Sequence, residues 1–391
     1  SGASLYLGSY ASGDNYMDMS AITPSTMQLN RLKWETTTEY NTGLDASFLK
    51  GKLRFTVDVY QKYIKDLLQK KVKMPTSIGY GNGYEVSYMN SGKMTNKGWE
   101  FRVDAVPFEN RDWRVGFYFN IAHNENKITE MPDNYTEENY TFNNGEYAYR
   151  REEGRPMGSF YGYRYKGVCQ NKDATYARDA DGNVMKDISG NAIVMRNGTA
   201  TIAPGDALYE DINHDGVINQ YDIVYLGNSN PRFTGGAGVN VSYKQFKLSA
   251  IFYGRYGQDV VNSTRLNNES MRGIDNQSTA VLRRWRNEGD QTDIPRALYG
   301  EGYNTLGSDR FVEDASYLRL KSLSFNYRLP KKIIQRWGFS NIDVYVTGYN
   351  LFTWTKYTGQ DPEVKTENTY ARDSATTPAS IQLVAGFNLS F

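Results

Sequence analysis

The sequence predicts an all-β protein, specifically a transmembrane antiparallel β-barrel. Apolar and polar residues alternate with a period of two, in segments of about 12–16 residues, whereas strands of globular proteins average roughly 5–6. Four tryptophans, Trp34, Trp99, Trp113 and Trp354, lie near the ends of such segments, where membrane barrels carry aromatic girdles. The connections between segments alternate between short and long, as they do in barrels of the bacterial outer membrane.

Nine strands are expected. They span residues 37–49, 52–66, 92–107, 112–126, 231–243, 246–258, 311–328, 341–354 and 380–391. From the second strand onward, the apolar stripes are Leu53, Phe55, Val57 and Val59; Trp99, Phe101 and Val103; Val115, Phe117 and Phe119; Ala237, Val239 and Val241; Phe246, Leu248 and Ala250; Ile342, Val344 and Val346; and Leu383, Ala385 and Phe387. We expect these stripes to face lipid and the residues between them, such as Asp58, Arg102, Asn120 and Asn388, to face the lumen.

The seventh strand changes phase part-way along. Leu318 and Leu320 lie on one parity, whereas Leu323 and Phe325 lie on the other. An extra residue in one strand of a pair, a β-bulge, restores the face to which side chains point. We therefore expect a bulge near Lys321-Ser322.

The connections divide the chain into two ends. Short links occur at Lys50-Gly51, Phe108–Arg111, Lys244-Gln245 and Pro330–Ser340, and long ones at about 67–91, 127–230, 259–310 and 355–379. A soluble β-sandwich would also alternate, but it has no reason to sort its connections by length. We expect residues 1–33 to be an extracellular loop segment and residues 34–391 to be barrel, with the long loops outside the cell. Because single-chain bacterial barrels have even strand numbers, further strands are expected in an N-terminal part.

Composition excludes several classes of protein. The 45 basic and 44 acidic side chains nearly cancel, so no bulk charge favours nucleic acid as a partner. Mean hydropathy is −0.66 and no run of 18 apolar residues exists, which argues against helical membrane spans. The single cysteine, Cys169, allows no internal disulfide framework. Ser1-Gly2-Ala3-Ser4 lacks the features of a signal peptide, so we expect a mature or, preferably, an internal start.

Several short motifs resemble those of the SusC-like (SusC/RagA) family of TonB-dependent outer-membrane transporters. In family order they are Leu32–Glu35, Tyr40–Asp45, Asn96–Glu100, Gly154–Tyr163, Pro204–Asp206, Asn230–Gly236, Arg284-Trp285, Ile294–Arg296, Ala315–Lys321, Tyr349–Trp354 and Asp361–Glu363. Each motif is weak alone, but together they span nearly the whole chain.

The resemblance implies the remaining architecture and the partners. The nine strands would be the C-terminal part of a 22-stranded barrel in the outer-membrane lipid of a Gram-negative bacterium. The N-terminal barrel strands, the plug and the segment that contacts the TonB complex would lie outside this sequence. A SusD-like lipoprotein would close the extracellular mouth and capture oligosaccharides or peptides. The implied function is import of these ligands, without catalysis.

Two other functions stay open. The first is a non-transporting outer-membrane barrel, an adhesin or a structural protein. The second, a barrel hydrolase, has little support because His123 and His214 are the only histidines and lie far apart in sequence. A plug and a TonB-contacting segment in the same gene would separate the transporter from the non-transporting barrel.

A calcium site is predicted in the second long connection. The ligand positions of a calcium loop are Asp211, Asn213, Asp215, Val217 (through its carbonyl), Asn219 and Asp222, with Gly216 at the turn. Oxygen ligands at positions 1, 3, 5, 7, 9 and 12 around a glycine suit a hard cation. Asp222 replaces the usual glutamate and shortens the reach. The alternative is an Asx-rich turn whose side chains bond backbone amides.

Tyrosines of the long loops are candidate ligand contacts. Tyr135, Tyr140, Tyr147 and Tyr149 could stack on sugars or on peptide side chains. The alternative is that they pack within the loops or against a lid. Both interpretations follow from an amphipathic ring that needs an apolar contact and a partner for its hydroxyl.

Overall fold

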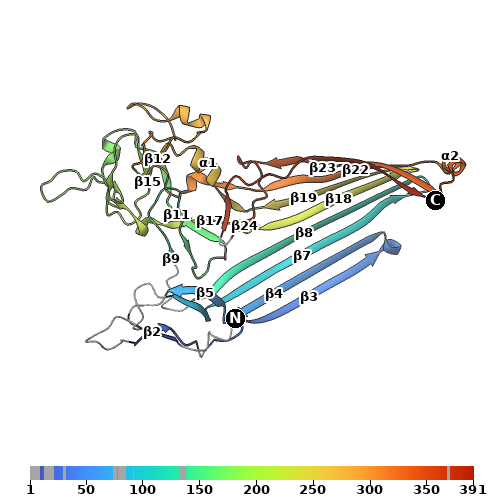
Figure 1. The fold of residues 1–391 in the computed structure, drawn as a ribbon, viewed down its shortest axis with the longest axis horizontal. Coiled ribbons are helices and arrows are strands. Elements are labelled where there is room, and N and C mark those ends of the chain that lie inside the picture. The colour runs from blue at the N-terminus through green and yellow to red at the C-terminus, as the bar shows by residue number, and fades with distance from the viewer. Residues whose placement is uncertain are drawn as a thin grey trace.

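The computed structural model describes residues 9–12, 22–29, 32–73, 77, 85–90, 92–131, 138–367 and 370–391. Its main element is a nine-stranded antiparallel sheet (Figure 1). The strands are β3 (Thr36–Phe48), β4 (Leu53–Lys65), β7 (Lys93–Glu109), β8 (Trp113–Glu130), β18 (Phe233–Tyr243), β19 (Phe246–Tyr256), β22 (Tyr317–Arg328), β23 (Asn341–Thr355) and β26 (Gln382–Ser390). Neighbours in this sheet follow chain order, so the strands form an up-and-down meander that is not closed into a ring by the described residues.

The expected strands are confirmed, with one boundary wrong. Eight of the nine strands have both ends within four residues of their predicted limits. The seventh begins at Tyr317 rather than at residue 311. The reason is that Asp309–Phe311 form a 3-10 turn and Val312–Asp314 (β21) pair with a different strand, β20 (Asp259–Asn262). The predicted strand is therefore too long at its start, because residues 311–316 belong to the loop end and not to the nine-stranded sheet.

The backbone register places the predicted apolar stripes on one face of the sheet. Rungs of paired residues on this apolar face include Trp113–Tyr243–Phe246–Tyr327–Val344–Phe387, Val115–Val241–Leu248–Phe325–Val346–Ala385 and Val59–Trp99–His123–Phe233–Tyr256. The intervening rungs form the polar face, for example Arg54–Asp104–Tyr118, Thr56–Arg102–Asn120 and Asp58–Glu100. The sheet thus has the two-sided character of a membrane barrel wall, apolar outside and polar inside.

The height of the apolar face matches a bilayer. Aromatic rungs lie at both of its ends: Trp113 packs against Tyr243 with ring centroids 4.3 Å apart, and the ring centroids of Trp99 and Phe233 are 6.2 Å apart. On β8, Trp113 and His123 occupy these two rungs. Ten residues at about 3.3 Å each, tilted by about 40°, cover about 25 Å. That is the height of the outward apolar band of outer-membrane barrels.

The predicted bulge is present. Ile251 pairs with Ser322 and Phe252 pairs with Leu320, so Lys321 is the extra residue of β22. A second irregularity, which no sequence pattern predicts, lies opposite it in β23 near Asn350, a residue with a φ of 53°. The bulge keeps Leu318 and Leu320 on the apolar face.

The long connections contain their own structure. Their strands are β5 (Leu68–Lys73), β6 (Glu85–Asn90), β9 (Glu138–Asn139), β10 (Tyr149–Arg150), β11 (Ser159–Gly162), β12 (Tyr165–Val168), β13 (Arg196–Asn197), β14 (Ala200–Thr201), β15 (Ala207–Tyr209), β16 (Val217–Ile218), β17 (Val224–Asn228), β20, β21, β24 (Thr366–Glu367) and β25 (Tyr370–Asp373). The segment before β3 contains β1 (Ser9–Ser12) and β2 (Ile22–Thr26), which pair with each other. Helix α1 (Ser263–Asn268) lies in the third long connection, and helix α2 (Lys331–Ile334) lies in the short link between β22 and β23. No helix among the described residues is long and apolar enough to cross a membrane.

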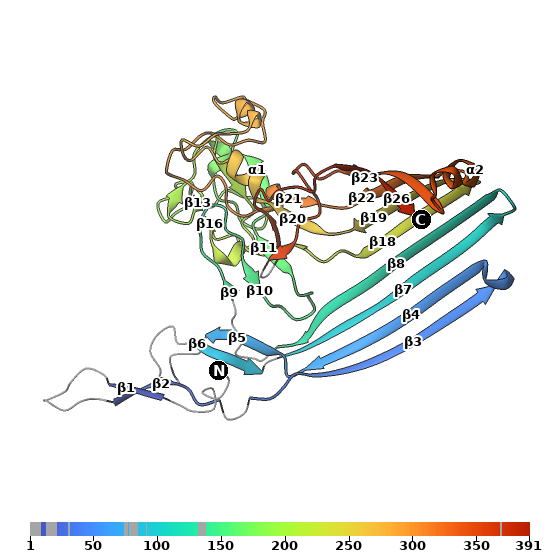
Figure 2. The same ribbon diagram turned by 45° about the vertical axis from the view of Figure 1, so that its right-hand side comes forward.

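The connections sort by length onto the two ends of the sheet, as predicted. In Figures 1 and 2 the long ones gather at one end, together with α1, whereas the short links and α2 lie at the other. The hairpin of β5 and β6 and the strands β9–β17 all belong to the long-loop end. That this end faces outside the cell, and that residues 1–33 are an extracellular segment, remain predictions.

Candidate functional site

The three long connections after β8 pack together into one folded unit, which we call the loop module (described residues within 131–232, 257–316 and 356–381). Its largest core contains Tyr161, Tyr163, Tyr209, Ile218 and Leu306, all at most 2% exposed. A second core is built on Phe160 and Phe311. The module therefore has an interior of its own rather than being a set of separate loops.

The candidate tyrosines belong to this interior. Tyr147 and Tyr149 are 5% and 8% exposed, and Tyr140 packs on the first core. The Tyr147 hydroxyl donates to the carbonyl of Ser308 at 2.8 Å, and burial raises the pKa of Tyr147. The structure thus supports packing within the loops for Tyr147 and Tyr149, whose rings are buried, while Tyr140 is partly buried against the first core. Tyr135 lies outside the described residues.

An ion pair joins the second and third long connections. Arg296 donates from Nε to one Asp206 oxygen at 2.7 Å and from Nη2 to the other at 3.1 Å. Asp206 also accepts from the backbone of Ala203, and Asn304 accepts the N–H of Ala207. Two motifs about 90 residues apart in sequence therefore bind each other through a two-point contact, the strongest arrangement available to arginine and carboxylate.

A buried network joins the third and fourth connections. Arg310 and Glu269 are 4% and 6% exposed at their side chains and lie 2.7 Å apart. Glu269 also pairs with Arg265 at 3.0 Å, and Arg265 with Glu313 at 3.2 Å. Glu313 accepts from the backbone N–H of Thr358 at 2.9 Å. Removing one member of such a chain leaves a buried charge without its partner.

A third network fixes the loop module to the sheet. Arg319 of β22, whose side chain is 3% exposed, contacts Asp361 at 2.5 Å and Glu363 at 2.8 Å. Lys321, the bulge residue, reaches Glu363 at 2.9 Å. Burial alone would raise the pKa of Asp361, but donors that include the N–H groups of Ala379 and Glu363, together with Arg319, lower the pKa overall. Arg319 and Lys321, two residues of β22, thus both bind the fourth connection.

The predicted calcium loop folds as a compact turn. Asp211 accepts the N–H of Gly216 at 2.8 Å, and Gly216 has a φ of 82°. Asp222, which is fully buried, accepts the N–H groups of Ile212 and Asn219, both at 2.8 Å. Burial is the main reason that the pKa of Asp222 is raised, and the negative charge of Asp211 adds a smaller effect in the same direction.

The remaining predicted ligands lie in the same turn. Asn213 donates to Asp215 at 2.9 Å, and Asn219 donates to the carbonyl of Val217 at 3.1 Å. These bonds match the Asx-turn alternative. Within the described ranges, no group of three or more His, Cys, Asp or Glu side chains is arranged to hold a metal. The oxygen-rich composition and the left-handed Gly216 still suit a hard cation, and calcium stays a prediction.

On the polar face, near the loop end, lies a hydrogen-bonding array that the sequence pattern alone does not reveal. Its rungs are Glu39–Lys62–Asn96–Asn126, Asn41–Tyr60–Gly98–Asn124 and Asp58–Glu100. Many of these residues line an open cavity of about 660 Å³. Lys62 pairs with Glu39 at 3.3 Å, which leaves Asp58 and Glu100 to give this lumen array a negative charge. Only the cross-strand register brings these residues together.

Gly98 gives the lumen array its shape. A Cβ at this position would lie 2.3 Å from the carbonyl oxygen of His123 and 2.6 Å from the Tyr60 hydroxyl. The Tyr60 ring crosses the space above Gly98, and its hydroxyl donates to Asn124 at 3.1 Å. The glycine of the Asn96–Glu100 motif is therefore required for close approach.

Comparison with known proteins agrees with this architecture. A model of the β-barrel of TonB-dependent receptor-like proteins matches residues 2–351. The chain belongs to this family. TonB-dependent receptor P3 of Formosa agariphila is 32% identical over 87% of the chain and 32% of its own length. TonB-dependent receptor SusC of Bacteroides thetaiotaomicron is 27% identical over 98% of the chain and 34% of its own length, which confirms the SusC-like resemblance.

Solved structures of related proteins have the same fold as this chain. A structure of the RagAB peptide transporter aligns with a TM-score of 0.70 and 26% identity, over 99% of this chain and 39% of that chain. The open-open state of the RagAB peptide importer aligns with a TM-score of 0.72 and 25% identity. The chain spans about a third of the length of the curated relatives that it matches. The nine strands thus correspond to one part of the barrel of these TonB-dependent receptors.

Proposed function

We propose that the full-length protein imports oligosaccharides or peptides across the outer membrane of a Gram-negative bacterium, using energy delivered through TonB. The observation that carries this proposal is the nine-stranded wall of a TonB-dependent receptor barrel, apolar on one face and polar on the other. The asparagines of the lumen array offer amide donors and acceptors, which suit the hydroxyls of sugars and the backbone of peptides.

Uptake by cells tests this function. A strain that lacks the full-length gene should lose growth on the transported oligomer, and the wild-type gene should restore it. Asp58→Asn combined with Glu100→Gln keeps the size of both side chains and removes the negative charge of the lumen array, so it should change the rate of uptake without changing the amount of protein in the membrane. A deletion strain that takes up every offered glycan and peptide normally, but adheres poorly, would favour the non-transporting barrel.

We also propose that a SusD-like surface lipoprotein closes the loop end of the barrel. Support comes from the family, from the resemblance to SusC and RagAB, and from the loop module, whose ordered surface is costly in conformational entropy if nothing packs on it. Gentle purification of the full-length protein from native outer membranes should yield a complex with such a lipoprotein.

The calcium site is proposed on the loop of Asp211, Asn213, Asp215, Val217, Asn219 and Asp222. Extracellular calcium modules bind with dissociation constants of about 10⁻⁴–10⁻³ M. Calorimetry of the full-length protein should detect a site in this range, and Asp215→Asn should weaken it. If the turn is held only by hydrogen bonds to its own backbone amides, calorimetry should show no heat of calcium binding, and the melting temperature should be the same with and without a chelator.

A further inference from the structure

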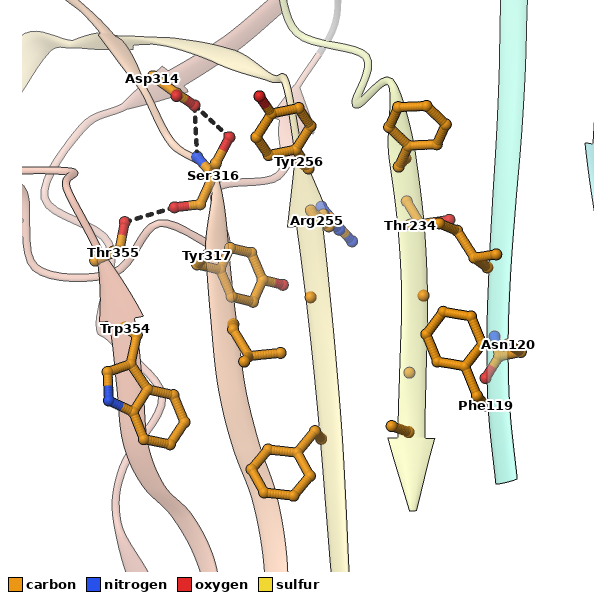
Figure 3. Close-up of a pocket in the computed structure, with 18 of the residues that line it drawn as sticks. Phe119, Asn120, Thr234, Arg255, Tyr256, Asp314, Ser316, Tyr317, Trp354 and Thr355 are labelled. Atoms are coloured by element: carbon orange, nitrogen blue, oxygen red, sulfur yellow. Dashed lines mark hydrogen bonds between the residues drawn. The ribbon is translucent and has the colours of Figure 1, made fainter. Parts of the chain in front are cut away.

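The apolar face carries a groove with a nearly bare floor. The rung Ile121–Gly235–Gly254–Leu318–Trp354 has glycine at two of its five positions. Aromatic and branched side chains stand around these glycines and enclose about 690 Å³, a volume typical of small-molecule sites. Figure 3 shows Trp354 and Phe119 on opposite sides of the groove. Because this face meets lipid, the groove opens into the bilayer.

A polar pocket continues the groove toward the loop end. Tyr256 and Asp314 line both spaces, and Figure 3 shows them together at one end of the groove. The pocket has a volume of about 520 Å³ and includes Lys127, Arg232 and Asp259 in its lining. It lies just beyond the aromatic rung that contains Trp99, His123 and Phe233. Aromatic girdles lie at the level of lipid headgroups.

The charges in this pocket are of both signs. Lys127 and Arg232 are exposed, and within the described part of the chain neither has an ion-pair partner within 4 Å; the neighbouring Glu125 pairs with Lys97 instead, at 3.1 Å. Asp259 and Asp314 face each other across the β20–β21 pair. Asp259 accepts from the backbone N–H of Asn228 at 3.1 Å, and burial raises its pKa despite the nearby Arg232.

We propose that the groove and the pocket together bind one membrane lipid with a zwitterionic, phosphoethanolamine-type headgroup. The acyl chain lies along Gly235 and Gly254. The phosphate meets Lys127 and Arg232, and the ammonium meets Asp259 and Asp314. Apolar groove, aromatic rung and charged pocket follow one another along the strands in the order in which chain, interface and headgroup follow one another in a lipid. A phosphate alone would leave the carboxylates facing a like charge, whereas a zwitterion matches both sets.

Lipid retention by the full-length protein tests the proposal. The protein is purified in detergent, delipidated, incubated with phosphatidylethanolamine, phosphatidylglycerol or diacylglycerol, and examined by native mass spectrometry. Phosphatidylethanolamine should be retained best. Because Lys127 and Arg232 are exposed, each would form an exposed ion pair with the phosphate, so Lys127→Gln or Arg232→Gln should weaken retention up to about fivefold and the double variant up to about thirtyfold.

Two matched variants test the groove itself. Ala237, on the rung with Phe119 and Phe252, lines the groove, and Ala250, on the rung below, does not. Ala237→Phe fills the groove and should abolish retention, whereas Ala250→Phe adds the same side chain to the same face and should leave it unchanged.

The contrary outcomes are equally specific. Equal retention of phosphatidylglycerol or diacylglycerol, loss of retention in Ala250→Phe, or normal retention in Ala237→Phe would overturn the proposal. Soluble phosphoethanolamine that binds as tightly as the lipid would show a headgroup site without a lipid site, and would also overturn it. None of these results depends on transport.

Discussion

At the residue scale, position relative to the bilayer decides what a substitution costs. Val103 lies on the rung with Phe55 and Phe119, near the middle of the apolar face, and Val57 lies one rung nearer the loop end. Arginine on the lipid face costs about 2–4 kcal/mol at the midplane and about 0–1 near the interface. The free energy of unfolding in lipid vesicles should therefore fall most for Val103→Arg and less for Val57→Arg.

Thr56→Arg is the control for this series. Thr56 lies next to Val57 but on the polar face, where its hydroxyl donates to Asp45 at 2.5 Å. An arginine there stays in the aqueous lumen and can pair with Asp45, so it should cost the least of the three. Equal costs at Thr56 and Val103 would mean that the faces of the sheet have been assigned wrongly.

At the element scale, strand β22 carries an ion network that can be tested. Arg319→Met removes a nearly buried cation from Asp361 and Glu363. Breaking one partner of a buried pair costs about 3–5 kcal/mol, so proteolysis of the fourth long connection should accelerate strongly. Lys321→Met is the control, because its side chain is 34% exposed and more exposed pairs contribute about 0–1 kcal/mol. Equal proteolysis of the two variants would contradict this account.

The same network predicts a dependence on pH. The pKa of Asp361 is lowered in the folded protein, whereas an unperturbed aspartate has a pKa of about 3.9. A lowered pKa contributes stability that is complete above about pH 4 and is lost as pH falls through the folded value. Protection of the fourth connection from hydrogen exchange should thus stay constant from about pH 8 to pH 5 and decrease below about pH 4 in the wild type. Asp361→Asn should show no such decrease.

The elements of the sheet were more predictable than those of the loops. Period-two alternation identified all nine strands, and the phase change between Leu320 and Leu323 identified the bulge, because both signals are local in sequence. The partners of Arg296 and Arg319 lie 90 and 42 residues away, and no periodicity connects them. Their motifs were visible, but only the structure shows that the motifs contact one another. The lumen array was missed for a related reason, since it depends on the register of four strands.

At the scale of the whole molecule, the structure shows which apolar side chains of the loop module stay exposed for contact with a partner protein. The loop module buries many of its aromatic side chains but leaves Ile188, Tyr221, Ile274, Leu282 and Tyr299 exposed. All five lie in the second and third long connections, at the end opposite the short links (Figure 2). A lipoprotein lid at this end would need anchors of this kind, and standard interfaces of about 1,200–2,000 Å² depend on a few such residues.

The final prediction tests these anchors in the full-length protein. Tyr221→Ser, Leu282→Ser and Tyr299→Ser together should lower the yield of co-purified lipoprotein at least about tenfold, because single anchors of this kind contribute 2 kcal/mol or more. Ile333 and Trp337 are also exposed but belong to the short link between β22 and β23. Ile333→Ser with Trp337→Ser should leave the yield unchanged. Both variants should retain the wild-type melting temperature, since none of these side chains is buried. If the short-link variant loses the lipoprotein and the loop variant keeps it, the lid does not close the loop end of the barrel.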